Sequence, residues 1–195
     1  MSDIICNNSC SDRVFCYNSG IKGKYYDDKR IMFVLHRSDS RAIKKDLGIE
    51  GLFRVEDMQL ENSYDEALRR SDTGRFLRWL TGYCGMTLDD VYITNMFKCL
   101  IPDDREPRYS EYGSCAELLR RQILDVKPEK ILVFGMKPYE YMFPEIYKTQ
   151  NFNRLKFERY ENIPALIINH PRRLHGMKRI ERQKYLIEIR NFLKS

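Results

Sequence analysis

The sequence predicts an α/β fold, a three-layer α/β/α sandwich with a mostly parallel central sheet of four strands. Short apolar runs typical of buried strands alternate with apolar residues at helical spacing, the order expected of parallel strands joined by helices. The 195 residues are 43% hydrophobic and 32% charged, a globular balance in a chain long enough for a large core. No repeat or linker interrupts the chain. We therefore expect one domain over residues 1–195, with a cysteine-bearing arm at its N-terminus.

The first half of the chain is expected to supply two strands. Residues 31–35 form a continuous apolar run behind two basic residues, which indicates a buried strand. Residues 37–62 are polar and mixed, and we expect a long loop there. Apolar residues between 64 and 82 recur at helical spacing, with an interruption near Gly74. Residues 91–94 predict the second strand.

The second half of the chain is expected to complete the sandwich with two more strands and their covering helices. A proline-punctuated loop leads into it, and Lys127-Pro128 ends its first helix. The expected elements are a helix over about 114–126 with Cys115 near its start, a strand over 130–135, a short helix over 138–143, a strand over 165–168 and a helix over 178–194.

Polar residues follow three of the predicted strands. They are residues 36–40 after the first strand, Asn95 after the second and His170 after the fourth. Ligands bind outside the carboxyl ends of the strands in open α/β sheets, so these residues are expected to converge on one site.

The charge balance is moderately basic. Lys and Arg number 34 against 28 Asp and Glu, a net charge of +6, which suits either a polyanionic partner or an ordinary solubilising surface. No apolar run approaches the roughly 20 residues of a membrane helix, and the N-terminus lacks a signal-peptide layout. We expect a monomer in the cytoplasm or on the nucleoid, with no membrane association.

Six cysteines are unusual for a chain expected in a reducing compartment, where disulfides are disfavoured. Cys6 and Cys10 are the one close pair, spaced C-x3-C, and the others are spread along the chain. Structural zinc sites usually have two closely spaced pairs of ligands, so this cysteine pattern fits zinc poorly. It is compatible with an iron–sulfur cluster, whose cysteine ligands can be more widely spread.

Three segments of the chain match the motifs of a known protein family. VYITNMFKCLIPDDREP, residues 91–107, resembles the segment VYITNVVKCRPPGNREP of the iron–sulfur family 4 uracil-DNA glycosylases. KPEKILVFG resembles the family strand PKVIVALG, and INHPRRL resembles its closing motif THPAAL. The resemblance runs in order from about Cys6 to the end of the chain. It implies the uracil-DNA glycosylase fold, a DNA partner and hydrolysis of the bond between a base and its sugar.

The resemblance also implies a cofactor. Carried over position by position, it makes Cys6, Cys10, Cys99 and Cys115 candidate ligands of a [4Fe–4S] cluster. The family spaces its first pair C-x2-C rather than C-x3-C, so Cys16 remains a rival for one place.

The same resemblance assigns roles to the strand ends and the last loop. Asn95 matches the amide that reads the pyrimidine edge, for which one donor and one acceptor are suited. His170 matches the histidine that stabilises negative charge on the departing base. The following loop occupies the place of the family's minor-groove wedge, with Leu174 filling the gap left by the extruded base. The DNA-binding candidates are Arg172, Arg173, Leu174, His175 and Lys178.

The chain departs from the family at its first motif, GEAPG, where residues 35–40 read LHRSDS. The family acid that assists water attack therefore has three candidates, and the aromatic residue that stacks on the base falls near Arg69 in one alignment. The candidates are Asp39, Glu56 and Asp57 for the acid, Tyr64 or Phe53 for the stacking residue, and His36 as a further substrate contact.

Losing this motif while keeping Asn95 and His170 is expected to reshape the base pocket rather than abolish it. The sequence thus predicts a monofunctional DNA glycosylase for a modified or bulky pyrimidine. The alternatives are a uracil-DNA glycosylase of base excision repair and a catalytically silent iron–sulfur protein that binds DNA. Covalent capture of an abasic site by His36 or His175 is a further option.

Overall fold

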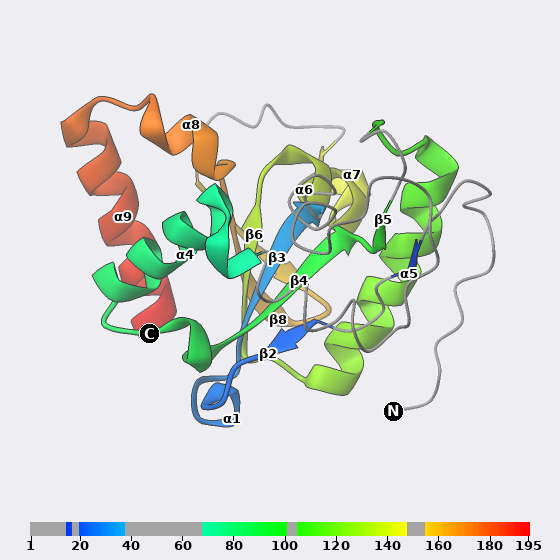
Figure 1. The fold of residues 1–195 in the computed structure, drawn as a ribbon, viewed down its shortest axis with the longest axis horizontal. Coiled ribbons are helices and arrows are strands. Elements are labelled where there is room, and N and C mark those ends of the chain that lie inside the picture. Colours follow the sequence, from blue (N-terminus) through cyan, green and yellow to red (C-terminus); the bar gives the residue numbers. More distant parts are fainter. Residues whose placement is uncertain (1–14, 17–19, 38–67, 101–104, 148–154) are drawn as a thin grey trace.

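A six-stranded sheet forms the centre of the computed structural model, which describes residues 15–16, 20–37, 68–100, 105–147 and 155–195 (Figure 1). Within these residues the strand order is β2-β4-β3-β6-β8-β7, and a separate two-stranded sheet pairs β1 with β5. The strands are β1 (Phe15–Cys16), β2 (Ile21–Lys22), β3 (Ile31–Arg37), β4 (Val91–Phe97), β5 (Cys99–Leu100), β6 (Lys130–Phe134), β7 (Lys156–Tyr160) and β8 (Ile163–Ile168).

The four strands predicted from the sequence are the parallel centre of this sheet. β3 pairs in parallel with β4 on one side and with β6 on the other, and β6 pairs in parallel with β8. The expected number of strands is wrong by two, because β2 and β7 add antiparallel edges. β2 has only two residues, and β7 alternates partly buried and exposed side chains, so neither has the apolar run of a central strand.

Helices cover both faces of the sheet, so the predicted α/β/α sandwich is confirmed. In Figure 1, α4, α8 and α9 lie on one side of the sheet, while α5, α6 and α7 lie on the other. The helices are α1 (Tyr26–Lys29), α4 (Asp72–Tyr83), the 3-10 helix η1 (Leu88–Asp90), α5 (Tyr109–Val126), α6 (Met136–Met142), α7 (Pro144–Tyr147), α8 (Pro171–His175) and α9 (Arg179–Lys194).

Strand β3 shows how the sandwich is held together. Ile31, Phe33 and Leu35 belong to the apolar cluster shared with α4 and α9, whereas Met32 and Val34 belong to the cluster shared with α5 and α6. All five side chains are at most 5% exposed. Alternate residues of a strand point to opposite faces, and burial of each such side chain contributes about 1.5–3 kcal/mol.

Two helices begin where local hydrogen bonds dictate rather than where the apolar pattern suggested. The interruption expected near Gly74 is the first turn of α4, capped by the Ser71 hydroxyl, which accepts from the Gly74 amide at 3.0 Å. A Cβ at Gly74 would lie 1.9 Å from the Leu68 carbonyl oxygen, so only glycine fits there. Helix α5 begins five residues before the expected position, because the Glu111 carboxylate accepts from the Arg108 amide at 2.6 Å.

In the part of the chain that the structure describes, no helix is both long enough and apolar enough to cross a bilayer.

Candidate active site

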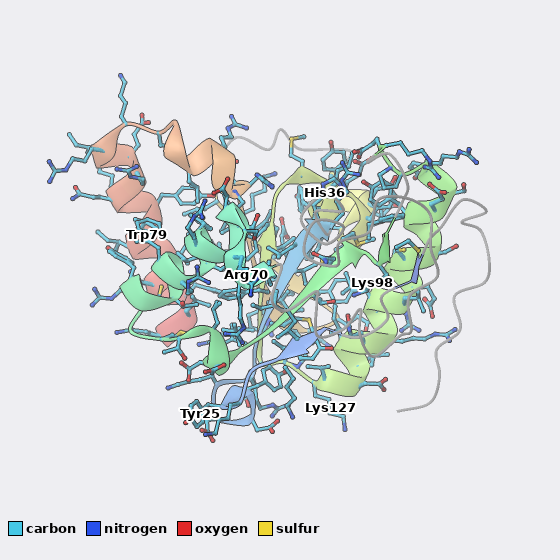
Figure 2. All side chains as sticks on the ribbon, in the orientation of Figure 1. Tyr25, His36, Arg70, Trp79, Lys98 and Lys127 are labelled. Carbon is cyan, nitrogen blue, oxygen red and sulfur yellow. The ribbon has the colours of Figure 1, made fainter. Side chains whose placement is uncertain are left out.

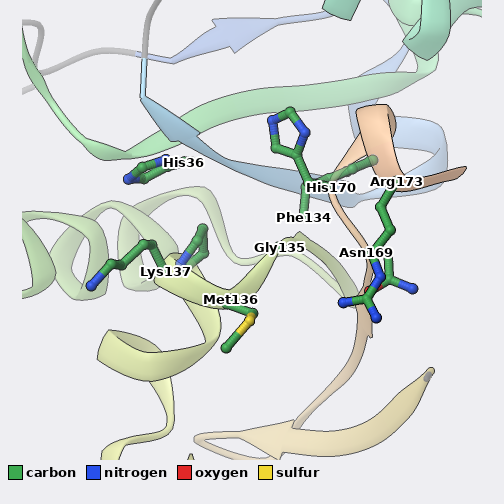
Figure 3. A pocket seen from close by; sticks show the side chains of 9 residues that line it. His36, Phe134, Gly135, Met136, Lys137, Asn169, His170 and Arg173 are labelled. Carbon is green, nitrogen blue, oxygen red and sulfur yellow. The ribbon is translucent and has the colours of Figure 1, made fainter. Parts of the chain in front are cut away.

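A pocket of about 270 Å³ opens at the carboxyl ends of β3, β6 and β8 (Figure 3). α4, which lies between β3 and β4 in the chain, covers one face of the sheet, and α6, which follows β6, covers the other. β3 and β6 therefore flank the kind of crevice in which α/β proteins bind ligands. The lining residues are His36, Phe134, Gly135, Met136, Lys137, Pro138, Asn169, His170 and Arg173.

Gly135 shapes the floor of the pocket between β6 and α6. Its φ of 93° is a backbone conformation that favours glycine, and its amide donates to the Ile168 carbonyl at 2.8 Å. The hydrogen bond ties the start of α6 to the end of β8. Consequently the residues that follow β6 and β8 share one rim, and a Cβ at Gly135 would already touch the His170 Cβ at 3.6 Å.

His36 lines the pocket from the end of β3. Its Nε2 lies 2.5 Å from the Tyr112 hydroxyl, and the two rings stack with centroids 5.9 Å apart. The pKa of His36 is lowered to about 4, mainly by burial. Glu106 acts in the opposite direction, and Arg37, His170 and Lys137 contribute to the lowering. The imidazole is therefore neutral at pH 7.

His170 and Arg173 line the pocket from the end of β8 and from α8. Both are exposed, and Figure 3 shows the His170 ring above Gly135, with His36 to its left. Lys178, just before α9, is exposed too. The expectation that Leu174 projects as a wedge does not fit this structure, because α8 turns it into the core, where it is 2% exposed.

Asn95 lies one strand away from the pocket lining. It is 3% exposed in the middle of the sheet, on β4, opposite Leu35 of β3. The structure thus brings His36 and His170 to one pocket, with Asn95 buried beside β3.

Several candidates from the sequence lie outside the described residues, so the structure is silent on them. For Arg172 and His175 the backbone belongs to α8, and only their side chains are undescribed. The undescribed candidates are Asp39, Glu56, Asp57, Tyr64, Phe53, Cys6 and Cys10.

Sequence reasoning missed two residues that hold His36. The Tyr112 hydroxyl donates to the Glu106 carboxylate at 2.9 Å, and Glu106 lies 3.8 Å from His36 Nε2. Burial and Glu106 raise the pKa of Tyr112, so its hydroxyl stays protonated. Glu106 falls inside the motif that resembles the family, but nothing in the sequence pairs these residues with His36, about 70 positions away.

The cysteines that follow β4 are compatible with cluster ligands. Cys99 and Cys115 are at most 4% exposed in one apolar cluster and form no disulfide, and the Lys98 amide donates to Cys115 Sγ at 3.4 Å. Amide hydrogen bonds to sulfur are typical of iron–sulfur sites. Backbone pairing also sets Cys16 opposite Cys99. Among the described side chains, however, no three ligating residues converge as a metal site would require.

A buried polar network connects this cysteine region to the strand of Asn95. Lys98, labelled in Figure 2, is 2% exposed, and its Nζ donates to Thr94 Oγ1 at 2.5 Å and to Gln122 Oε1 at 2.6 Å. Gln122 in turn donates to the Tyr92 hydroxyl at 2.8 Å. Buried charges are tolerated when hydrogen-bonded in this way.

Comparison with known proteins identifies the family to which the chain is similar. The model of the uracil DNA glycosylase superfamily matches residues 19–194. The chain is 33% identical over 69 residues to the type-4 uracil-DNA glycosylase of Saccharolobus solfataricus, covering 35% of this chain and 32% of that protein. It is 33% identical over 70 residues to the type-4 enzyme of Archaeoglobus fulgidus, covering 36% and 35% of the two chains. These alignments thus span about a third of each relative.

Proposed function

This chain belongs to the uracil DNA glycosylase superfamily, and from that membership and its pocket we propose that it is a monofunctional DNA glycosylase. Its reaction adds water to C1′ of a flipped nucleotide, and the base leaves with the electrons of the glycosidic bond. The observation that carries the proposal is the pocket at the carboxyl ends of β3, β6 and β8, with His36 and His170 on its wall.

In this proposal Asn95 and His170 divide the work on the base. Asn95 reads the edge of the pyrimidine, and His170 donates toward O2 as negative charge builds there. One of Asp39, Glu56 or Asp57 assists the attacking water. Arg173, exposed at the pocket, and Lys178 would hold phosphates, together with Arg172 and His175.

We propose further that the substrate is a modified or bulky pyrimidine rather than plain uracil. The supporting observation is that β3 ends in Leu35-His36-Arg37, where the family's first motif supplies glycine, acid and proline. His36 there lines the pocket with a ring already held by Tyr112. A pocket with a different wall is expected to accept a different base.

The test is release of a base from defined oligonucleotides. Single- and double-stranded DNA carrying uracil, hypoxanthine, 5-hydroxymethyluracil or modified cytosines is incubated with the protein, and abasic sites are counted after alkaline cleavage. We expect release of a substituted pyrimidine, abolished in Asn95→Ala. Release of uracil alone would overturn the substituted-base proposal, and no release from any substrate would favour a DNA-binding protein without activity.

We also propose that Cys99 and Cys115 are two ligands of a [4Fe–4S] cluster. When bound, such a cluster would cross-link β5, α5 and the N-terminal arm as a structural element. Cys10 lies six residues before Cys16, so it can be no farther than about 20 Å from the β1–β5 pairing. The two remaining thiolates can therefore come from Cys6 and Cys10, or from Cys16 together with one of these two.

Iron analysis of cysteine variants distinguishes these ligands. Cys99→Ala and Cys115→Ala are each expected to reduce bound iron and sulfide to near zero in anaerobically purified protein. Cys84→Ala is the matched control. Cys84 is equally buried, but it packs in the apolar core on the other face of the sheet. Full iron content in Cys99→Ala would contradict the assignment, and Cys16→Ala, Cys10→Ala and Cys6→Ala identify the other ligands.

A further inference from the structure

Three side chains from separate parts of the chain form a hydrogen-bonded series that ends at the pocket. Glu106 accepts from the Tyr112 hydroxyl at 2.9 Å, and the Tyr112 hydroxyl lies 2.5 Å from His36 Nε2. Tyr112 is 1% exposed and stacks on Tyr141, with ring centroids 4.5 Å apart. The tyrosine ring is therefore fixed, and His36 is the member of the series that lines the pocket.

Counting hydrogens along this series fixes the tautomer of His36. The Glu106 carboxylate is the acceptor of the hydrogen bond from the Tyr112 hydroxyl, at 2.9 Å. The single hydrogen of the Tyr112 hydroxyl is used toward Glu106. The contact between that hydroxyl and His36 Nε2 then needs its hydrogen from the imidazole, which places the hydrogen on Nε2.

The other ring nitrogen of His36 is left as an acceptor. Burial lowers the pKa of His36 to about 4, so at neutral pH the ring carries one hydrogen only. None of the hydrogen bonds found for His36 within the described residues uses Nδ1. Nδ1 is thus available to a ligand in the pocket that His36 lines together with His170 (Figure 3).

We propose that Glu106 and Tyr112 are positioning residues that hold His36 as a hydrogen-bond acceptor, so that the pocket selects a base carrying a hydrogen-bond donor. This inference rests on the proposed function. With O2 of the pyrimidine toward His170, the donor is on the opposite edge, as the 4-amino group of a cytosine or a 5-hydroxymethyl group. A uracil presents its O4 acceptor on that edge, and two facing acceptors repel each other and lose their water.

Matched base pairs measure this selection. Cytosine against uracil exchanges an amine for an oxygen, and 5-hydroxymethyluracil against thymine adds only a hydroxyl. We expect kcat/KM for the donor-bearing member of at least one pair to exceed that of its counterpart about tenfold or more. The pair that responds identifies the donor as amine or hydroxyl.

Tyr112→Phe removes the hydroxyl while keeping the ring that stacks on His36 and Tyr141. The preference is expected to fall below about threefold, because either tautomer of His36 then becomes accessible. Glu106→Gln should act in the same direction, since its amide can donate to the Tyr112 hydroxyl and reverse the series. Tyr141→Phe is the matched control, and it should retain the wild-type preference.

Nitrogen-15 NMR of labelled histidine tests the positioning role without any turnover. The sequence has three histidines, and His36→Gln assigns the His36 signal. We expect an Nε2–H imidazole in the wild type and a mixture of tautomers in Tyr112→Phe. An Nδ1–H imidazole in the wild type would overturn the inference, whatever the activity.

Failure of the proposed function gives a different pattern. If the wild type releases no base, the same preference is measured as binding affinity for oligonucleotides carrying each base. Equal affinity within both pairs overturns the selection of a donor, as does equal turnover when base release is observed. Preferential binding that is lost in Tyr112→Phe upholds the inference even though catalysis is absent.

Discussion

Replacing His170 with alanine is expected to slow base release by about 10²- to 10³-fold, the usual effect of removing a group that stabilises developing negative charge. His170 follows β8 at the pocket rim, which Gly135 leaves open by lacking a side chain. The negative charge appears on the base only as the glycosidic bond breaks. Affinity for DNA should therefore stay within about threefold of wild type, because ground-state binding does not use that interaction.

Single-turnover kinetics with enzyme in excess separates these two effects. The rate constant for base release is measured on the best substrate of the panel, and affinity is measured on the same oligonucleotide. His170→Asn, which keeps an N–H donor, should recover part of the rate. Arg173→Ala is the matched control at the same rim, expected to weaken binding and its salt dependence with the rate constant preserved. A His170→Ala rate near that of wild type would remove His170 from the mechanism.

The centre of the fold could be predicted because its strands are buried on both faces. The parallel strands β3, β4, β6 and β8 are built mainly of buried apolar residues. The polar residues that follow three of these strands include His36 and His170, which both line the pocket. The edges could not be predicted. Strand β7 reads KFERY, and its partly exposed alternation resembles a polar loop until β8 pairs with it.

Residues that depend on tertiary packing also escaped prediction. PRRLHG reads as a basic loop, and only the fold shows that a short helix buries Leu174 against the core. The series of Glu106, Tyr112 and His36 joins the end of β3 to the first turn of α5, so local sequence cannot reveal it. Glycine at position 74 illustrates the same point, because its close approach to Leu68 lies outside any apolar pattern.

Replacing Gln122 with leucine is expected to cost about 3 kcal/mol of unfolding free energy, which lowers the melting temperature by about 6–12 °C. Leucine has a similar size, so the loss comes from hydrogen bonds rather than volume. The buried Lys98 ammonium loses its 2.6 Å acceptor, and Thr94 and Tyr92 each lose a partner. Gln183→Leu, an exposed change on α9, is the matched control and should shift the melting temperature little.

Removing the charge as well as its acceptor distinguishes electrostatics from packing. The double variant Lys98→Met with Gln122→Leu should recover most of the lost stability, because an apolar pair replaces a buried charge at little net cost. A double variant no more stable than Gln122→Leu would contradict this account. The network joins Tyr92 and Thr94 of β4, and Lys98 directly before Cys99, to Gln122 of α5. Destabilising it is therefore also expected to lower bound iron and base release together. Iron content that falls while the melting temperature does not would separate the cysteine site from the network.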